Sequence, residues 1–167
     1  MEQTNHFWSI PTGVTDAKEY TDELKSVPRD LKSMVERIQH ATVHIWWSRF
    51  HGIVLSPERN LEITIRTIHE KLSKLEKLGP VSKVVGERPL ESKLVCNCRD
   101  ISVIAVAALR AHGVPARARC GFSKYFEPGM HVDHWVAEAW DCSAGKWRRF
   151  DPQLTDEMRR ELGVKFD

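Results

Sequence analysis

Residues 97–122 read NCRDISVIAVAALRAHGVPARARCGF, and this stretch decides the fold that the sequence predicts. Side chains in 101–111 are almost all apolar, which is typical of a helix that is buried on every side. Gly113 ends that helix, and Pro115 prevents its continuation. In 116–122, small or apolar side chains alternate with arginines, and this period of two predicts a strand with one buried face. The stretch therefore predicts a buried helix that leads straight into a sheet.

Two further alternating segments follow, in residues 134–140 and 147–151. Gly145 lies between them, at a place where glycine allows a tight turn. We therefore expect the two segments to be antiparallel neighbours joined by a hairpin. Together with the buried helix they predict an α+β fold, in which a central helix packs on an antiparallel sheet.

The N-terminal half, about 15–80, is predicted to be helical. Spacings of three and four between apolar residues predict one helix over about 30–44 and a longer one over 56–79. The longer helix has a Ser-Pro-Glu start signal and a Gly-Pro stop signal. Residues 80–95 are interpreted as a loop, within which 84–85 could form a short strand.

Length and composition indicate one globular domain over residues 1–167. Hydrophobic residues make up 41% of the chain and charged residues 29%, as in ordinary globular domains. The net charge is only +2, and no concentrated basic stripe is present, so we expect no nucleic-acid partner. The nearest cluster of charge is formed by Lys146, Arg148 and Arg149 and is interpreted as a solvated edge.

The first ten residues lack the positive start and the apolar run of a signal peptide. No stretch approaches the ~18 apolar residues of a membrane span, so we expect no membrane partner. A cytoplasmic location is therefore the expectation, and its reducing conditions argue against disulfides.

Cys98 stands at the predicted start of the buried helix and is the candidate nucleophile. Asn97 is a suitable N-cap residue, and Asp100 is an acid placed well for the helix end. A thiolate is stabilised at a helix N-terminus and is then an activated nucleophile. A buried, inert cysteine is the plainer alternative. Cys96 is the rival nucleophile, but the helix start favours Cys98.

His134 begins one predicted strand, and Asp151 ends the next. The histidine could serve a thiol as general base and then as general acid, while the carboxylate holds the imidazole in the correct tautomer. Taken singly, the histidine is equally consistent with a structural role, and an aspartate before proline is usually a turn residue. His131 is a local rival for the base. If the triad forms, a carboxylate oxygen of Asp151 should lie roughly 2.6–3.2 Å from one ring nitrogen, with Cys98 at the other.

Three segments together resemble the core of the transglutaminase-like superfamily. Residues 97–122 are similar to its pattern of a cysteine, a nearby aspartate and an apolar helix ending in L-R-x-x-G-[IV]-P-A-R. DHWVAEAW (133–140) resembles its H-x-W-x-E-x-W strand, and WRRFDPQ (147–153) resembles its W-x-x-x-D-P strand. The match covers a core of about 94–153. The resemblance implies a papain-like, transglutaminase-core fold, with Cys98 as nucleophile, His134 as base and Asp151 as the residue that orients it.

The resemblance implies a cysteine-dependent acyl-transfer enzyme. Its substrate would be a protein, a peptide or a small-molecule amide, attacked at a carboxamide or peptide amide through a thioester. Whether water or an amine resolves the thioester is not readable from the sequence. The competing hypotheses are a non-catalytic binding module that keeps the fold, and a biosynthetic acyltransferase acting on a small molecule or a carrier-bound thioester.

No cofactor and no metal are expected. The animal transglutaminases use calcium, but no D-x-D-x-D-G loop is present here. Cysteines and histidines gather in 96–142, and such a cluster raises the alternative of a structural zinc site. The C-x-C spacing is not that of a zinc knuckle, and no second C-x-x-C follows, so the zinc hypothesis is disfavoured.

Both backbone and side-chain groups are candidates for stabilising the oxyanion. The backbone N–H of Cys98 is one expected donor, because it would stand at a helix start. Side chains proposed for the oxyanion site or the substrate cleft are those of Asn97, Trp46, Trp47 and Trp135.

Overall fold

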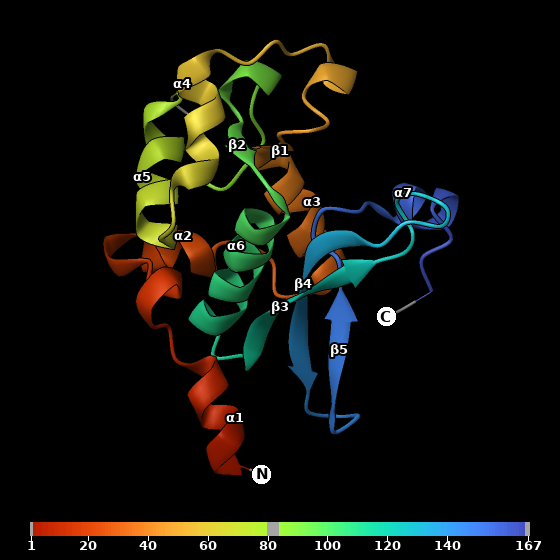
Figure 1. Cartoon of the computed structure of the whole chain (residues 1–167). Helices are drawn as coiled ribbons and strands as arrows, with labels where there is room; N and C mark the ends of the chain where they lie inside the picture. The colour runs from red at the N-terminus through yellow and green to blue at the C-terminus, as the bar shows by residue number, and fades with distance from the viewer. Residues whose placement is uncertain (1, 80–83, 166–167) are drawn as a thin grey trace.

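The computed structural model describes residues 2–79 and 84–165. Helix α6 (Cys98–Ala111) lies at the centre, with the three-stranded sheet on one side and helices of the N-terminal half on the other (Figure 1). The chain therefore has the α+β fold that was predicted. Its central element is the helix that begins at Cys98.

Helix α6 is buried almost all round, as predicted. Every residue from Asp100 to Leu109 is buried. Ile104 and Leu109 are each 1% exposed, and burial of such a side chain contributes roughly 1.5–3 kcal/mol. The helix is thus the main apolar support of the sheet that it covers.

The sheet consists of β3 (Ala116–Ser123), β4 (Val132–Asp141) and β5 (Lys146–Phe150), in that order, and both pairings are antiparallel. This confirms the predicted hairpin. The expected burial of one whole face of 116–122 is wrong, however, because Cys120 is exposed and Phe122 is 75% exposed. Ala116 is fully buried, so only the first part of the strand is covered.

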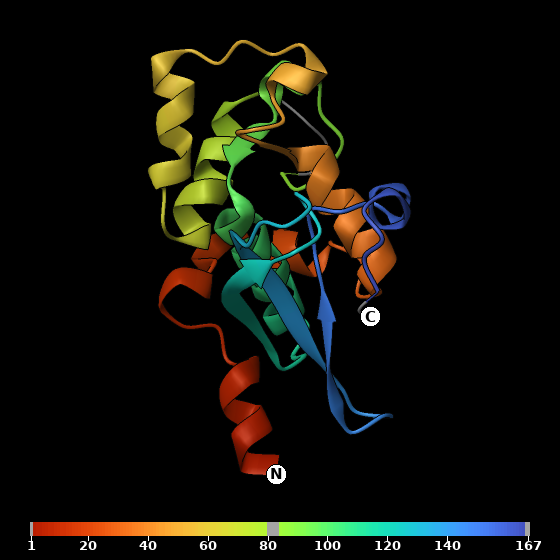
Figure 2. The ribbon, with the colours of Figure 1, turned by 45° about the vertical axis from the view of Figure 1, so that its right-hand side comes forward.

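The helices outside the core are short. They are α1 (Glu2–Ser9), α2 (Thr21–Lys25), α3 (Leu31–Ala41), α4 (Pro57–Asn60), α5 (Ile68–Lys77) and α7 (Asp156–Glu161). Single 3-10 turns occupy Gly13–Thr15, Lys18–Tyr20, Arg49–His51, Leu61–Thr64 and Leu90–Ser92. Helix α7 returns to lie beside α3, where Lys32 and Asp156 are 3.5 Å apart (Figures 1 and 2).

The helix predicted over about 30–44 ends early, at Ala41. Its last residues form strand β1 (Thr42–His44), which pairs in parallel with β2 (Leu94–Cys96). The hydroxyl of Thr42 donates a hydrogen bond of 2.8 Å to the carbonyl of Ile38, and the β-branched Thr42 and Val43 then favour extended backbone. Strand β2 was missed within the loop predicted over 80–95. Residues 84–85 form a bend instead of a strand, and residues 80–83 lie outside the described part of the chain.

The helix predicted over 56–79 is interrupted. Helix α4 passes into a 3-10 turn, and α5 begins only after Thr67. The hydroxyl of Thr67 accepts a hydrogen bond from the backbone N–H of Glu70, whose carboxylate accepts one from the Thr67 N–H. This capping box starts a new helix. The predicted apolar stripe also fails at Leu61, which is 63% exposed.

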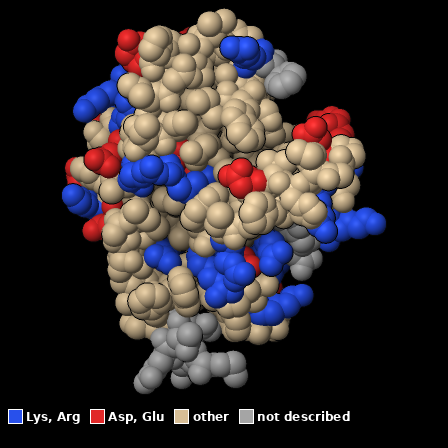
Figure 3. Space-filling model, in the orientation of Figure 1, with Lys and Arg blue, Asp and Glu red and all other residues tan. Residues whose placement is uncertain are grey.

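The outer side of the sheet carries arginines around one buried acid. Glu138 is 4% exposed and lies 2.7 Å from Arg117, 3.4 Å from Arg149 and 3.7 Å from Arg119. Figure 3 shows Lys and Arg side chains gathered where the sheet lies in this orientation. The buried carboxylate accounts for part of this local excess of positive charge.

Candidate active site

Cys98 is the first residue of α6. The first turn of this helix is held by two hydrogen bonds between Asn97 and Asp100. The Asn97 side chain accepts a hydrogen bond of 3.1 Å from the Asp100 N–H, and the Asp100 carboxylate accepts one of 3.1 Å from the Asn97 N–H. Asp100 is fully buried, and its carboxylate lies 3.0 Å from the ammonium of the fully buried Lys71 and 2.6 Å from the guanidinium of Arg99. The start of the helix is therefore held rigidly, while Cys98 itself remains partly exposed.

Cys96, the rival nucleophile, points into the core. It ends β2 and is fully buried. Burial raises the pKa of its thiol far above the ordinary value, so this thiol stays protonated. Of the two neighbouring cysteines, only Cys98 reaches a cavity.

His134 and Asp151 meet as the hairpin predicts. His134 lies on β4 and is 5% exposed, and Asp151 directly follows β5, the antiparallel neighbour of β4. Nε2 of the imidazole is 2.7 Å from Oδ2 of the carboxylate, within the predicted range. Nε2 is engaged in this way, and Nδ1 lies 3.2 Å from the side-chain nitrogen of Gln153. The rival base, His131, is exposed on the loop before β4.

The carboxylate of Asp151 is held by several donors. The Tyr125 hydroxyl donates a hydrogen bond of 2.7 Å to Oδ2, and the backbone N–H of Gln153 donates one of 3.1 Å to Oδ1. Burial, together with the charge of Asp151, raises the pKa of Tyr125 strongly, so the phenol stays neutral and remains a donor. Asp151 is 2% exposed, and its orientation toward the imidazole is thereby fixed.

The imidazole of His134 is biased toward its charged form. Burial alone would lower its pKa, but hydrogen bonds to Asp151 and to the Cys98 thiol outweigh this, and the pKa is raised to about 9. Cys98 and His134 also line the same cavity. Cys98, His134 and Asp151 thus form one connected group of side chains.

Sequence reasoning missed two residues in contact with this group. One is Tyr125. The other is Gln153, which is 4% exposed and places its side-chain nitrogen 2.9 Å from Nε2 and 3.2 Å from Nδ1 of His134. Within the described residues, Oε1 of Gln153 has no hydrogen-bond partner. Gln153 follows Asp151 by two residues, and its place in the D-P-Q segment was the available signal.

A cavity of about 710 Å³ opens over Cys98 and His134. The proposed cleft residues Asn97, Trp46, Trp47 and Trp135 all line it. Its other lining residues are His44, Ile45, Ile63, Arg99, Phe126, Glu127, Val132, Asp133 and Gln153. Four of these residues, Trp46, Trp47, Phe126 and Trp135, bring large aromatic rings to the lining. A substrate reaching the thiol would therefore pass between apolar surfaces.

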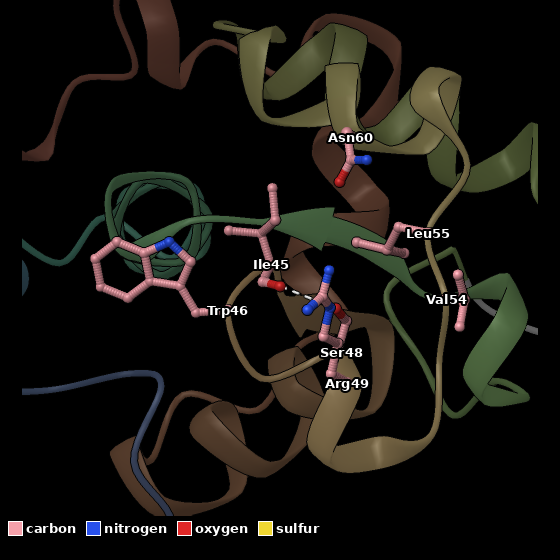
Figure 4. Close-up of a pocket in the computed structure, with 7 residues that line it drawn as sticks. All are labelled: Ile45, Trp46, Ser48, Arg49, Val54, Leu55 and Asn60. Atoms are coloured by element: carbon pink, nitrogen blue, oxygen red, sulfur yellow. Dashed lines mark hydrogen bonds between the residues drawn. The ribbon is translucent and has the colours of Figure 1, made fainter.

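A second hollow of about 390 Å³ adjoins the cavity and shares Ile45 and Trp46 with it (Figure 4). Trp46 lies on the opposite side of Ile45 from Val54 and Leu55 in this view. Trp46 is 65% exposed and Val54 is 94% exposed. The apolar surface near Cys98 therefore continues beyond the cavity.

Among the residues that the structure describes, no group of three His, Cys, Asp or Glu side chains is placed to hold a metal ion. Over the same residues, no helix is long and apolar enough to cross a membrane. The absence of a nucleic-acid partner and the cytoplasmic location stay predictions.

The sequence model of the transglutaminase-like superfamily matches residues 59–152. This is more than half of the chain, and the chain belongs to that superfamily. The superfamily includes cysteine-dependent enzymes, and the matched range contains Cys98, His134 and Asp151.

Two solved structures are similar to the chain. One is the periplasmic domain of TgpA from Pseudomonas aeruginosa, bound to ethylmercury; it is 18% identical, with a TM-score of 0.49, over 94% of this chain and 51% of that chain. The other is a protein from Cytophaga hutchinsonii that is provisionally named a cysteine protease; it is 19% identical, with a TM-score of 0.31, over 85% of this chain and 45% of that chain. The chain thus spans about half the length of each. No curated protein matches it.

Proposed function

We propose that the protein is a cysteine-dependent acyl-transfer enzyme that acts on a carboxamide or peptide amide. The observation that carries this proposal is that Cys98 and His134 line one cavity, while the His134 imidazole lies 2.7 Å from the carboxylate of Asp151. A thiol next to an imidazole that is itself oriented by an acid is the arrangement of a nucleophilic triad.

The charge state of the imidazole supports this role. With its pKa raised to about 9, His134 is protonated near neutral pH, and a protonated imidazole favours a thiolate as its partner. Asp151 stabilises the imidazolium and directs Nδ1 toward the sulfur. The pair is then poised to attack before any substrate binds.

The reaction proceeds in two steps. Sγ of Cys98 forms a bond to the carbonyl carbon, and as the C–N bond breaks, His134 gives its proton to the leaving nitrogen. This leaves a thioester and a neutral imidazole. Water or an amine then attacks the thioester, His134 takes the proton of that nucleophile, and the C–S bond breaks to restore the thiolate. The products are a carboxylic acid with water, or a new amide with an amine.

The cavity lining favours a substrate with an apolar group near its amide. Trp46, Trp47, Phe126 and Trp135 line the cavity, and the apolar surface continues past Ile45. Such a lining suits a peptide or a protein segment with large apolar side chains. A small amide with an apolar substituent fits the same chemistry.

A screen of peptide and small-molecule amides would test the proposal. The full chain is incubated with the library, release of ammonia or amine is measured, and the trapped thioester is located by mass spectrometry. The expected result is turnover with an acyl adduct on Cys98, which is abolished in Cys98→Ala and kept in Cys120→Ala, a change at an exposed cysteine outside the cavity. Absence of turnover and of a selectively reactive Cys98 would contradict the proposal and favour the binding-module hypothesis.

A further inference from the structure

Attack on an amide places a negative charge on the carbonyl oxygen, and this oxyanion needs hydrogen-bond donors. The backbone N–H of Cys98 is one such donor. It belongs to the first residue of α6, so it has no acceptor within the helix. A second donor must come from another element that borders the cavity.

The fold brings His44 to the same cavity as this N–H. It ends β1, which pairs in parallel with β2, and its partner in the register is Cys96. The N–H of Ile45 donates a hydrogen bond of 2.8 Å to the Cys96 carbonyl, so the two strands stay joined up to the turn before Cys98. The His44 side chain lines the same cavity as Cys98 and His134.

The hydrogen bond that the His44 ring accepts defines which ring nitrogen carries the proton. The backbone N–H of Trp46 lies 3.3 Å from Nδ1 and donates to it. A ring nitrogen that accepts a hydrogen bond carries no proton, so the neutral imidazole bears its hydrogen on Nε2. Within residues 2–79 and 84–165, no hydrogen bond engages Nε2. His44 therefore has a free N–H donor.

The ring is also held in place. It packs edge-on against Trp46, with 5.6 Å between ring centroids, and at a tilt against Trp47, with 5.2 Å. His44 is only 8% exposed. A donor fixed before the reaction needs no reorganisation when charge develops, and such a donor is the effective kind.

We propose that His44 donates a hydrogen bond from Nε2 to the oxyanion, together with the backbone N–H of Cys98. This inference rests on the proposed acyl transfer and assigns a catalytic residue to it. Two of the earlier candidates are less suitable, because the Asn97 side chain caps α6 and Trp46 is 65% exposed.

The two histidines of the cavity would then have separate roles. Burial and the nearby His134 lower the pKa of His44 to about 4, although the carboxylates of Asp151 and Asp100 act in the opposite direction. His44 is thus neutral where His134, with its pKa raised to about 9, is protonated. His44 is a donor at neutral pH and does not compete as the base.

Two probes of Cys98 separate this role from a merely structural one. p-Nitrophenyl acetate acylates a thiolate through a tetrahedral oxyanion, forms a C–S bond and expels p-nitrophenolate. Iodoacetamide alkylates the same thiolate by displacing iodide and forms no oxyanion. The rates of both reactions are measured for the wild type, His44→Phe, His44→Gln and the matched control His40→Ala, a change at an exposed histidine on α3.

His44→Phe should slow acylation on the order of 10²-fold and leave alkylation within about threefold, with an unchanged pH profile of alkylation. His44→Gln keeps an N–H donor and should recover part of the acylation rate, and His40→Ala should match the wild type. Unchanged acylation in both His44 variants, or an equal loss of acylation and alkylation in His44→Gln, would overturn the inference and leave the proposed function standing. If wild-type Cys98 reacts no faster than Cys120 with either probe, the proposed function itself fails.

Discussion

The cavity over Cys98 has two walls of different construction. The catalytic wall consists of the start of α6, strand β4 and residues 151–153, where buried polar groups are hydrogen-bonded to one another. The aromatic wall consists of Trp46, Trp47 and Phe126, which lie on turns and loops outside the strands. Regular, buried elements fix the geometry that a reaction needs, whereas loops can change their side chains without loss of the fold. The proposed nucleophile and base therefore lie on regular elements, and the aromatic side chains that line the cavity beside His44 lie mainly on turns and loops.

The largest effect is expected on the catalytic wall, at Cys98. Cys98→Ala should lower acyl transfer by at least ~10⁴-fold, because no other cysteine lines the cavity within the part of the chain that the structure describes. The loss would be measured as the ratio of the steady-state turnover rates of the wild type and Cys98→Ala on the amide found by screening. Cys120→Ala provides the matched control, and substantial activity in Cys98→Ala would remove the distinction between the two walls.

Asp151→Asn should lower the rate on the order of 10³–10⁴-fold, because an amide cannot stabilise the imidazolium or fix its tautomer in the same way. The rate of alkylation of Cys98 near pH 7 should fall as well, since His134 would no longer favour the thiolate. Asp156→Asn, at an exposed acid on α7, is the control. If Asp151→Asn turned over substrate at the wild-type rate, the 2.7 Å contact between His134 and Asp151 would have no part in catalysis.

Stability should depend on pH through His134. Its pKa is raised from 6.5 in the unfolded chain to about 9 in the fold, so the folded state binds the proton more tightly. The resulting contribution, on the order of 2–3 kcal/mol, is fully present below about pH 6.5 and is lost as the pH rises through about 9. Urea unfolding between pH 6 and pH 10 measures it. Asp151→Asn should flatten this slope; equal slopes in both proteins would assign the effect to other groups.

The smallest effect is expected on the aromatic wall. Trp46→Ala should change KM or the preference among apolar substrates by roughly tenfold or less, while alkylation of Cys98 stays the same. Its melting temperature should hardly change, because the side chain is 65% exposed. Leu61→Ala removes a similarly exposed apolar side chain elsewhere and is the control. A large loss of thiol reactivity in Trp46→Ala would mean that this wall also shapes the chemistry.

Local patterns predicted the catalytic wall. The alternation around His134 and the turn at Gly145 specify a hairpin, and a hairpin places Asp151 next to His134 through contacts between neighbouring residues. The apolar run after Cys98 likewise specifies a buried helix. These elements depend on sequence neighbours, and they were correct.

The rest of the site depends on contacts between distant residues. Strand β1 has three residues, too few for a periodic pattern, and it exists because it pairs with β2 about fifty residues later. His44 was therefore assigned to the end of a helix and was not considered for the site. The burial of Lys71 likewise could not be predicted from its sequence neighbours. A buried ammonium needs an opposite charge, and here that charge is the carboxylate of the distant Asp100.

The buried ion pair between Lys71 and Asp100 links the N-terminal half of the chain to the C-terminal half. Lys71 also donates a hydrogen bond of 2.7 Å to the carbonyl of Ile65, so α5 and the first turn of α6 share one buried charge network. A fragment limited to 94–153 would keep Cys98, His134 and Asp151 and would still expose an acid that needs its distant lysine. The helical half also contains His44, and a break in the chain between α5 and α6 would separate Cys98 from the lysine that holds the start of its helix in place.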